Sequence, residues 1–152
     1  MLLMRKTFNQ SAYRGGLEDK IAEELTQQGV RFQYEPPGWV LYSRPQSKYK
    51  PDFLLPNGII IETKGQFLSS DRSKHKLIKK QHPDLDIRFV FSNSKSRIGK
   101  KSKTTYAMWC ERNGFLYADK SIPPEWIEEK LSAKQLNKAK ELCKREVKQK
   151  KS

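Results

Sequence analysis

Two short apolar runs that meet at Pro-Asn-Gly constrain the fold of this chain more than any other feature. The stretch is Pro51-Asp52-Phe53-Leu54-Leu55-Pro56-Asn57-Gly58-Ile59-Ile60-Ile61-Glu62-Thr63-Lys64. Apolar runs on either side of a glycine-containing turn are typical of a β-hairpin, because the turn lets the two runs pair as antiparallel strands. The charged residues of the stretch all lie at the open end of this predicted hairpin.

The register of the hairpin decides which side chains share a face of the sheet. A two-residue loop at 57–58 would pair Asp52 with Thr63 and point the aspartate away from Glu62. A three-residue loop at 56–58 would instead pair Asp52 with Glu62. We favour the three-residue loop, because such loops commonly need a glycine in the left-handed conformation.

In that register two carboxylates and the ammonium group of Lys64 converge. Like charges side by side in a sheet repel, and a divalent cation between them would remove the repulsion. Acids and lysines are also ordinary at strand ends, where they form a solvated hairpin mouth. The hairpin alone therefore leaves two interpretations open, a metal site at Asp52 and Glu62 or a plain surface cluster.

The excess of basic residues predicts an anionic partner. The chain has 152 residues and a formal net charge of +14, with an isoelectric point of about 9.8. Nucleic acid is the simplest partner for such a charge, and the length fits one domain with a buried core. Charge alone names no reaction.

Cysteine spacing and hydropathy argue against other classes of protein. Cys110 and Cys143 form neither a C-x-x-C motif nor a cluster with histidine, so we expect a reduced, cytoplasmic chain without structural zinc. No apolar run approaches the roughly 18 residues of a membrane span, and the amino terminus lacks the pattern of a signal peptide. We therefore expect no membrane partner.

The chain before the hairpin predicts one helix and one strand. Leu17, Ile21 and Leu25 recur at helical spacing, and Gly29 ends that helix. Glu18 lies in its first turn, where it either complements the helix dipole or faces a neighbouring element. Alternating apolar and polar residues over 30–35 predict a half-buried strand.

Residues 36–50 carry large apolar side chains without a regular pattern that would bury them in their own domain. They include Trp39, Val40, Leu41 and Tyr42. This segment is a candidate for pairing with a second copy of the chain, with an ordinary surface loop as the alternative.

Beyond the hairpin, the pattern predicts a crossover unit. Ser69 or Ser70 caps a basic helix that ends near residue 81, and residues 86–92 form a strand, so part of the sheet should be parallel. A short helix over 104–113, a strand at 115–117 and a last helix after Pro123-Pro124 follow. Their tryptophans, Trp109 and Trp126, belong to the core.

Two basic segments are candidates for contact with DNA phosphates. The predicted helix that ends near residue 81 is mostly basic, and His75 and His82 lie in a basic, exposed context. Residues 93–104 contain several basic residues and no acid. The candidate contacts are Lys74, His75, Lys76, Lys95, Arg97, Lys100, Lys101 and Lys103. By composition we divide the chain into a basic arm (1–14), one domain (15–131) and a lysine-rich tail (132–152).

The spacing of Pro51-Asp52 and Glu62-Thr63-Lys64 is similar to the P-D…(D/E)-x-K signature of restriction-endonuclease-like nucleases. Further matching stretches occur over roughly residues 14 to 130: Gly16-Leu17-Glu18-Asp19-Lys20, Gln81-His82-Pro83-Asp84-Leu85-Asp86-Ile87-Arg88, Ala118-Asp119-Lys120 and Pro124-Glu125-Trp126-Ile127. In this order they resemble the endonuclease I family of the short-tailed T-odd phages, which are Holliday-junction resolvases.

The resemblance implies an α/β fold with a mixed sheet flanked by helices, and a domain-swapped, intertwined homodimer in which residues 36–50 form an extended bridge between the subunits. It implies composite active sites, in which Asp52, Glu62 and Lys64 come from one subunit and Glu18 reaches the site from the other. The chain departs from the family at Gln33, where the family has an acid. Glu35 is the candidate substitute.

The resemblance also implies Mg²⁺, with Mn²⁺ as a substitute, two ions per active site and no small-molecule cofactor. Asp52, Glu62 and the Thr63 carbonyl would hold one ion, and Glu18 with a shared Asp52 oxygen the second. A lysine beside two carboxylates stays protonated, so Lys64 is expected to act electrostatically rather than as a general base.

The function implied is cleavage of four-way and other branched DNA by paired nicks, with little sequence preference, in the cytoplasm of the host cell. A symmetric dimer suits a two-fold symmetric junction, and basic surfaces contact the backbone rather than base identity. Two alternatives stay open. One is a nicking or site-specific nuclease on the same fold, and the other a non-catalytic, basic nucleic-acid-binding protein.

Overall fold

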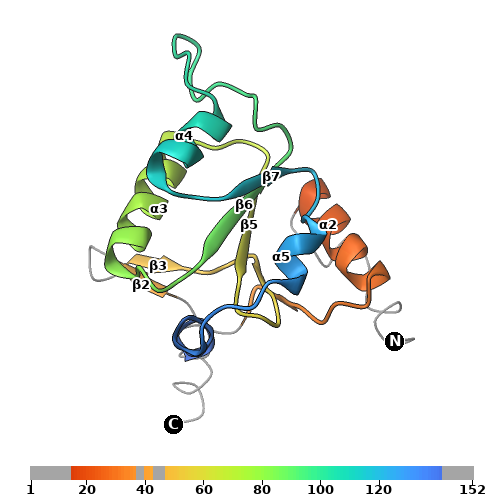
Figure 1. The fold of residues 1–152 in the computed structure, drawn as a ribbon. Coiled ribbons are helices and arrows are strands. Elements are labelled where there is room, and N and C mark those ends of the chain that lie inside the picture. Colours follow the sequence, from red (N-terminus) through yellow and green to blue (C-terminus); the bar gives the residue numbers. More distant parts are fainter. Residues whose placement is uncertain (1–14, 37–39, 43–46, 142–152) are drawn as a thin grey trace.

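A five-stranded mixed sheet forms the centre of the computed structural model, which describes residues 15–36, 40–42 and 47–141 (Figure 1). The strand order is β1-β4-β5-β6-β7; β1 pairs antiparallel with β4 and β4 with β5, whereas β5, β6 and β7 are parallel. The strands are β1 (Gln33–Tyr34), β4 (Phe53–Leu54), β5 (Ile60–Lys64), β6 (Ile87–Phe91) and β7 (Tyr117–Asp119).

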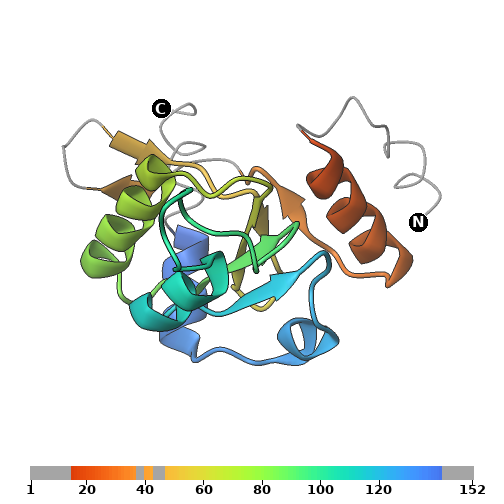
Figure 2. The ribbon, with the colours of Figure 1, turned by 90° about the horizontal axis from the view of Figure 1, so that it is seen from above.

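Helices cover both faces of the sheet (Figures 1 and 2). On one face lie α3 (Ser69–Gln81) and α4 (Tyr106–Asn113), and on the other α2 (Gly16–Gln27) and α5 (Pro124–Glu128). Each face has its own apolar core, because side chains alternate along the strands: Ile60 belongs to the core under α3 and α4, and Ile61 to the core under α2 and α5. The mixed α/β fold with flanking helices is confirmed.

The hairpin has the three-residue loop that the sequence predicts. Phe53 pairs with Ile61 and Leu54 with Ile60, a register that continues to place Asp52 opposite Glu62. Gly58 has a φ of +96°, in the left-handed range that favours glycine.

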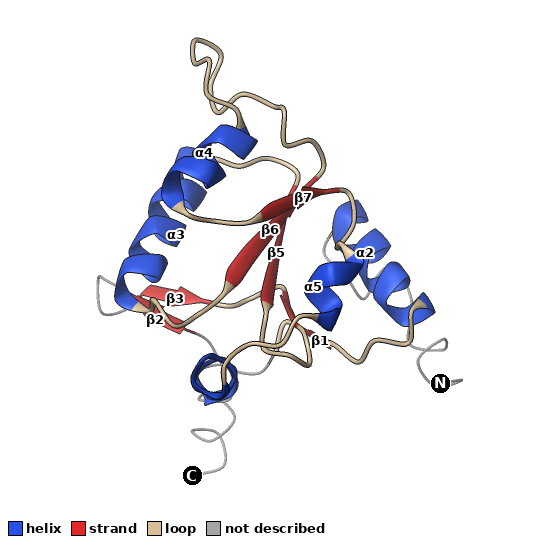
Figure 3. Cartoon of the chain, in the orientation of Figure 1, coloured by secondary structure: helices blue, strands red, loops and turns tan. Residues whose placement is uncertain are grey.

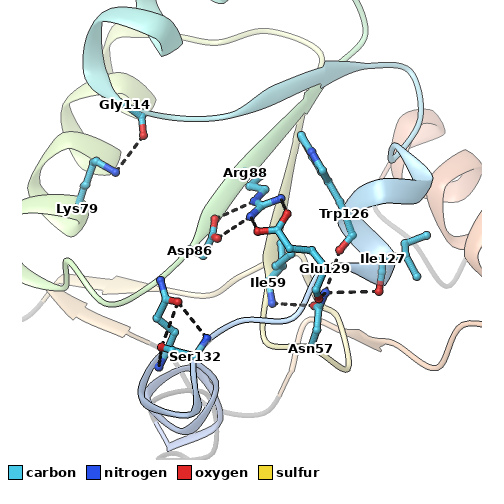
Figure 4. Close-up of polar contacts among 11 residues, drawn as sticks. Asn57, Ile59, Lys79, Asp86, Arg88, Gly114, Trp126, Ile127, Glu129 and Ser132 are labelled. Atoms are coloured by element: carbon cyan, nitrogen blue, oxygen red, sulfur yellow. Dashed lines mark hydrogen bonds and ion pairs between the residues drawn. The ribbon is translucent and has the colours of Figure 1, made fainter.

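The tip of the hairpin is fixed to the chain around α5 (Figure 4). Asn57 Nδ2 donates to the carbonyl oxygens of Trp126 at 2.8 Å and Glu129 at 2.6 Å. The buried Arg88 guanidinium binds the carboxylates of Asp86 and Glu129. These contacts tie β6 and the hairpin tip to the segment after α5.

The predicted crossover is confirmed, with α3 connecting the parallel strands β5 and β6. The predicted serine cap of α3 is wrong. The N-cap residue is Leu68, and Asp71 in the first turn accepts a hydrogen bond from the Leu68 N–H at 3.1 Å. Asp71 therefore binds the N–H of the N-cap residue, whereas a serine side chain at the cap would accept from an N–H within the first turn.

Residues 36–50 do contain regular structure, contrary to the expectation of an unpatterned segment. Strands β2 (Val40–Tyr42) and β3 (Ser47–Tyr49) form an antiparallel pair beside α3 (Figures 2 and 3). Val40 and Tyr49 are partners in this pair, and both are fully buried in the core of the same chain. The sequence concealed this because each strand buries a single residue of three.

The carboxyl-terminal part differs in detail from the sequence-based expectation. The last strand lies at Tyr117–Asp119 rather than at 115–117, because Phe115 packs against the Trp109 ring with centroids 5.7 Å apart. Residues 133–141 are helical, and Ala139 is fully buried in the core. None of the helices in the described ranges is long and apolar enough to cross a membrane.

Candidate active site

The open end of the hairpin brings Asp52, Glu62 and Lys64 together, as the predicted register requires. Lys64 Nζ lies 3.6 Å from Glu62 Oε2. Asp52 Oδ2 accepts two hydrogen bonds from Thr63, from its N–H at 2.9 Å and its hydroxyl at 3.0 Å. Thr63 thus orients the aspartate, and the side chains of Asp52, Glu62 and Lys64 meet where β5 ends.

Glu62 is buried, with 4% of its surface exposed. Burial raises the pKa of its carboxyl group to about 8, and the nearby Asp52 adds to the effect. Burial also raises the pKa of Asp52. Burial thus disfavours the ionised form of both carboxyl groups, and a cation bound between them would stabilise that form.

Lys64 lies between two carboxylates. Its Nζ is 3.2 Å from Asp71 Oδ1 as well as 3.6 Å from Glu62. Burial alone would lower the pKa of Lys64, but Glu62 and Asp71 outweigh it and raise the pKa above the ordinary value of 10.5. A permanently charged ammonium group can stabilise negative charge on a phosphate, and it is a poor proton acceptor.

Two residues at this site escaped the sequence analysis. The Tyr49 hydroxyl donates to Glu62 Oε1 at 2.8 Å, and Asp71 holds both Lys64 and the first turn of α3. An acid in the first turn of the predicted helix was a usable signal for Asp71. No local pattern identifies Tyr49, because its contact depends on the pairing of β2 with β3.

Glu18 lies on α2, where its carboxylate accepts a hydrogen bond from the Tyr34 hydroxyl. The Tyr34 ring contacts Phe53, the residue next to Asp52, with centroids 5.3 Å apart. Within the described ranges, no three His, Cys, Asp or Glu side chains form a group that could hold a metal ion. Within one chain, therefore, Glu18 does not complete a three-acid group with Asp52 and Glu62.

Glu35, rather than the aligned Gln33, is adjacent to the site. Its N–H donates to the Asp52 carbonyl oxygen at 2.7 Å, and Gln33 is exposed on β1. Glu35 also has a φ of +44°, which non-glycine residues seldom adopt. Its charge is a minor contribution, after burial, to the raised pKa of Asp52.

The prediction that His75 is an exposed phosphate contact is wrong. Its side chain is fully buried, and its ring packs edge-on against Tyr49 and Phe89, with centroids 5.0 Å and 4.9 Å away. Burial, followed by the charges of Lys74 and Lys64, lowers its pKa well below the ordinary value of 6.5.

The other predicted DNA contacts are accessible. Lys74 is partly exposed, with its ammonium group 5.2 Å from the centre of the Tyr49 ring. The loop after β6 is fixed at its base by Ser94, which donates to the Asp119 carboxylate at 2.6 Å and 2.7 Å, and it projects beside α4 (Figure 1). The remaining predicted contacts are exposed: Lys76, Lys95, Arg97, Lys100, Lys101 and Lys103.

Comparison with known proteins identifies the family. The family model for phage endonuclease I matches residues 2–148. Endonuclease I of Escherichia phage T7 is 54% identical over 121 residues, covering 78% of this chain and 80% of the relative. Endodeoxyribonuclease 1 of Enterobacteria phage T3 is also 54% identical over 121 residues, covering 78% of both chains. This chain therefore belongs to the phage endonuclease I family.

Proposed function

We propose that this protein is a metal-dependent endodeoxyribonuclease that resolves four-way DNA junctions by paired nicks. Membership of an endonuclease family makes the chain a nuclease, and the name of the phage T3 relative supports DNA as the substrate. The observation that carries the proposal is the convergence of the buried Glu62 carboxyl group, the partly buried Asp52 carboxyl group and a charged lysine at the end of β5.

The residues fit a hard divalent cation. Asp52, Glu62 and the Thr63 carbonyl offer the oxygen ligands that Mg²⁺ prefers, and the raised pKa values show the cost of ionising both acids without a cation. Asp52 Oδ2 is engaged by Thr63, so we assign its Oδ1 to the metal. We assign a second ion to Glu18, with Mn²⁺ able to replace Mg²⁺. When bound, Mg²⁺ supplies Lewis-acid stabilisation of charge on phosphate oxygens.

The chain's own residues orient the reactants and stabilise charge. Lys64 donates a hydrogen bond to the scissile phosphate or to the attacking water, because its ammonium group is already positioned beside Glu62. Thr63 keeps Asp52 in place through two hydrogen bonds. The exposed lysines and Arg97 bind backbone phosphates away from the cut.

Paired nicking needs two active sites, and a two-fold symmetric dimer provides them. We propose that residues 36–50 connect the two halves of an intertwined dimer, and that Glu18 enters the active site of the partner subunit. Co-expression of Glu18→Ala and Glu62→Ala chains tests this. In a composite arrangement the mixed dimer regains one intact site and nicks one strand. In a non-composite arrangement every site carries a defect and no nicking is recovered.

The substrate is tested with purified protein and Mg²⁺ on a labelled immobile junction, beside linear duplex of the same sequence. We expect symmetric paired nicks in the junction and little cutting of the duplex. Equal cutting of both would contradict junction selectivity, and a single nick at one sequence would favour a site-specific nicking enzyme. Glu62→Ala and Lys64→Ala proteins should bind the junction without cutting it.

A further inference from the structure

We propose that Tyr49 is a positioning residue of this active site, because its hydroxyl fixes the orientation of the Glu62 carboxylate. The inference deepens the proposed function and rests on it, since Glu62 is assigned there to the metal. Tyr49 itself touches neither the metal nor the DNA in this assignment. It acts through Glu62.

The two oxygens of Glu62 have different neighbours. Oε1 accepts the hydrogen bond from the Tyr49 hydroxyl at 2.8 Å, and Oε2 faces Lys64 Nζ at 3.6 Å. The last torsion of a glutamate side chain has a broad energy profile, so packing alone fixes a carboxylate poorly. A donor on one oxygen and a cation near the other select one orientation of the Glu62 carboxylate plane.

Tyr49 is itself firmly held. Its side chain is fully buried, and β3 pairs it with the equally buried Val40. The ring meets the His75 ring at an interplanar angle of 80°, and His75 packs in turn on Phe89 of the sheet. In the part of the chain described, both nitrogens of His75 lack a hydrogen-bond partner. The histidine therefore holds the Tyr49 ring by packing alone and does not compete for its hydroxyl group.

The arrangement links the segment 36–50 to the active site. Tyr49 lies at the end of β3, three residues before Asp52, and reaches across to β5. A displacement of β3 would therefore move the donor away from Glu62. The segment that we propose to connect the subunits thus carries a residue that orders the site of cleavage.

Tyr49→Phe tests the inference in the full chain, because it removes the hydroxyl and keeps the ring. We expect about a 10- to 100-fold loss in junction cleavage or in metal affinity, the range for residues that orient a metal ligand. Junction binding without metal and the melting temperature should stay near wild type. Tyr42→Phe is the matched control, since Tyr42 lies in the paired strand β2 and its change should leave cleavage unaltered.

Binding of Mn²⁺ by calorimetry, without DNA, gives a readout besides activity. Tyr49→Phe and Glu62→Gln should each weaken Mn²⁺ binding, and the double variant should be no weaker than Glu62→Gln, because Tyr49 acts through Glu62. Wild-type Mn²⁺ affinity and cleavage in Tyr49→Phe would overturn the inference. So would a lowered melting temperature with unchanged Mn²⁺ affinity. If wild-type protein bound Mn²⁺ but cut no junction, the proposed function would fail, while weaker Mn²⁺ binding by Tyr49→Phe would still support positioning.

Discussion

Asp71 binds the ammonium group of Lys64 at 3.2 Å with one carboxylate oxygen, and the Leu68 N–H at 3.1 Å with the other. One side chain thus connects the start of α3 to the lysine at the end of β5. Because Glu62 Oε2 also lies 3.6 Å from Lys64 Nζ, two acids that belong to different elements set the position of the ammonium group.

Asp71→Asn should lower the rate of junction cleavage about 10-fold, because the neutral amide holds the lysine less firmly. Asparagine keeps an oxygen that can accept from the Leu68 N–H, so the melting temperature should change little. Single-turnover cleavage at saturating Mg²⁺ measures the effect. Asp84→Asn, in the turn after α3, is the control, and equal rates for both variants would contradict a role for Asp71.

Glu62→Gln should stabilise the metal-free protein, and by a larger margin as pH rises. The pKa of Glu62 in the folded state is about 8, above its ordinary value of 4.5. Between these two pH values the Glu62 carboxyl group is therefore protonated in the folded chain and ionised in the unfolded chain. Stability from this group is therefore lost as pH rises from about 5 to 8, and glutamine removes that loss. The measurement is the difference in melting temperature between variant and wild type across this range. Added Mg²⁺ should reverse the order by stabilising the wild type.

The exposed acid Glu128 supplies the control for this experiment. Glu128→Gln makes the same change at an exposed carboxylate, and it should alter the melting temperature little. If the difference in melting temperature between Glu62→Gln and wild type did not change with pH, Glu62 would ionise in the folded state as readily as in the unfolded state.

The hairpin register could be predicted because local chemistry determines it. The loop needs a residue with positive φ, and Gly58 fixes the position of that residue; the pairing of Asp52 with Glu62 then follows from the period of a strand. The family could be recognised for the same reason, since its motif lies on this hairpin.

Contacts made by tertiary packing could not be predicted in this way. Tyr49 reaches Glu62 because two three-residue strands fold against α3, and strands that short leave little periodicity. His75 was misjudged because its sequence neighbours are lysines. His75 lies three residues before Ile78, and this spacing places both on the buried face of α3. The many lysines of the helix favour an exposed histidine instead, and that expectation is wrong.

His75→Phe should reduce the loss of stability in mild acid. The folded-state pKa of His75 lies well below the ordinary value of 6.5. Just below pH 6.5, His75 therefore binds a proton in the unfolded chain but stays neutral in the folded chain. Stability is therefore lost as pH falls through about 6.5, and phenylalanine, which fits the aromatic surroundings, removes this loss. Melting temperatures of both proteins at pH 7 and pH 5 test it. An equal fall in both would mean that His75 is protonated in the fold. His82→Phe is the comparison at a partly exposed histidine.

Gly58→Ala should destabilise the protein by about 2 kcal/mol or more, because the left-handed backbone itself costs roughly 1–2 kcal/mol for a residue with a Cβ. The added Cβ would also lie 2.9 Å from Leu136 Cδ1 and 3.2 Å from Leu136 Cα, and the backbone atom cannot rotate away. Gly29→Ala is the matched control: its φ is +70°, and nothing lies within 4 Å of the added Cβ. Denaturant unfolding of both variants separates the backbone cost from the contact. Equal losses would show that the helix at 133–141 does not pack on the hairpin tip. A larger loss for Gly58→Ala would place that helix against the same hairpin that carries Asp52 and Glu62.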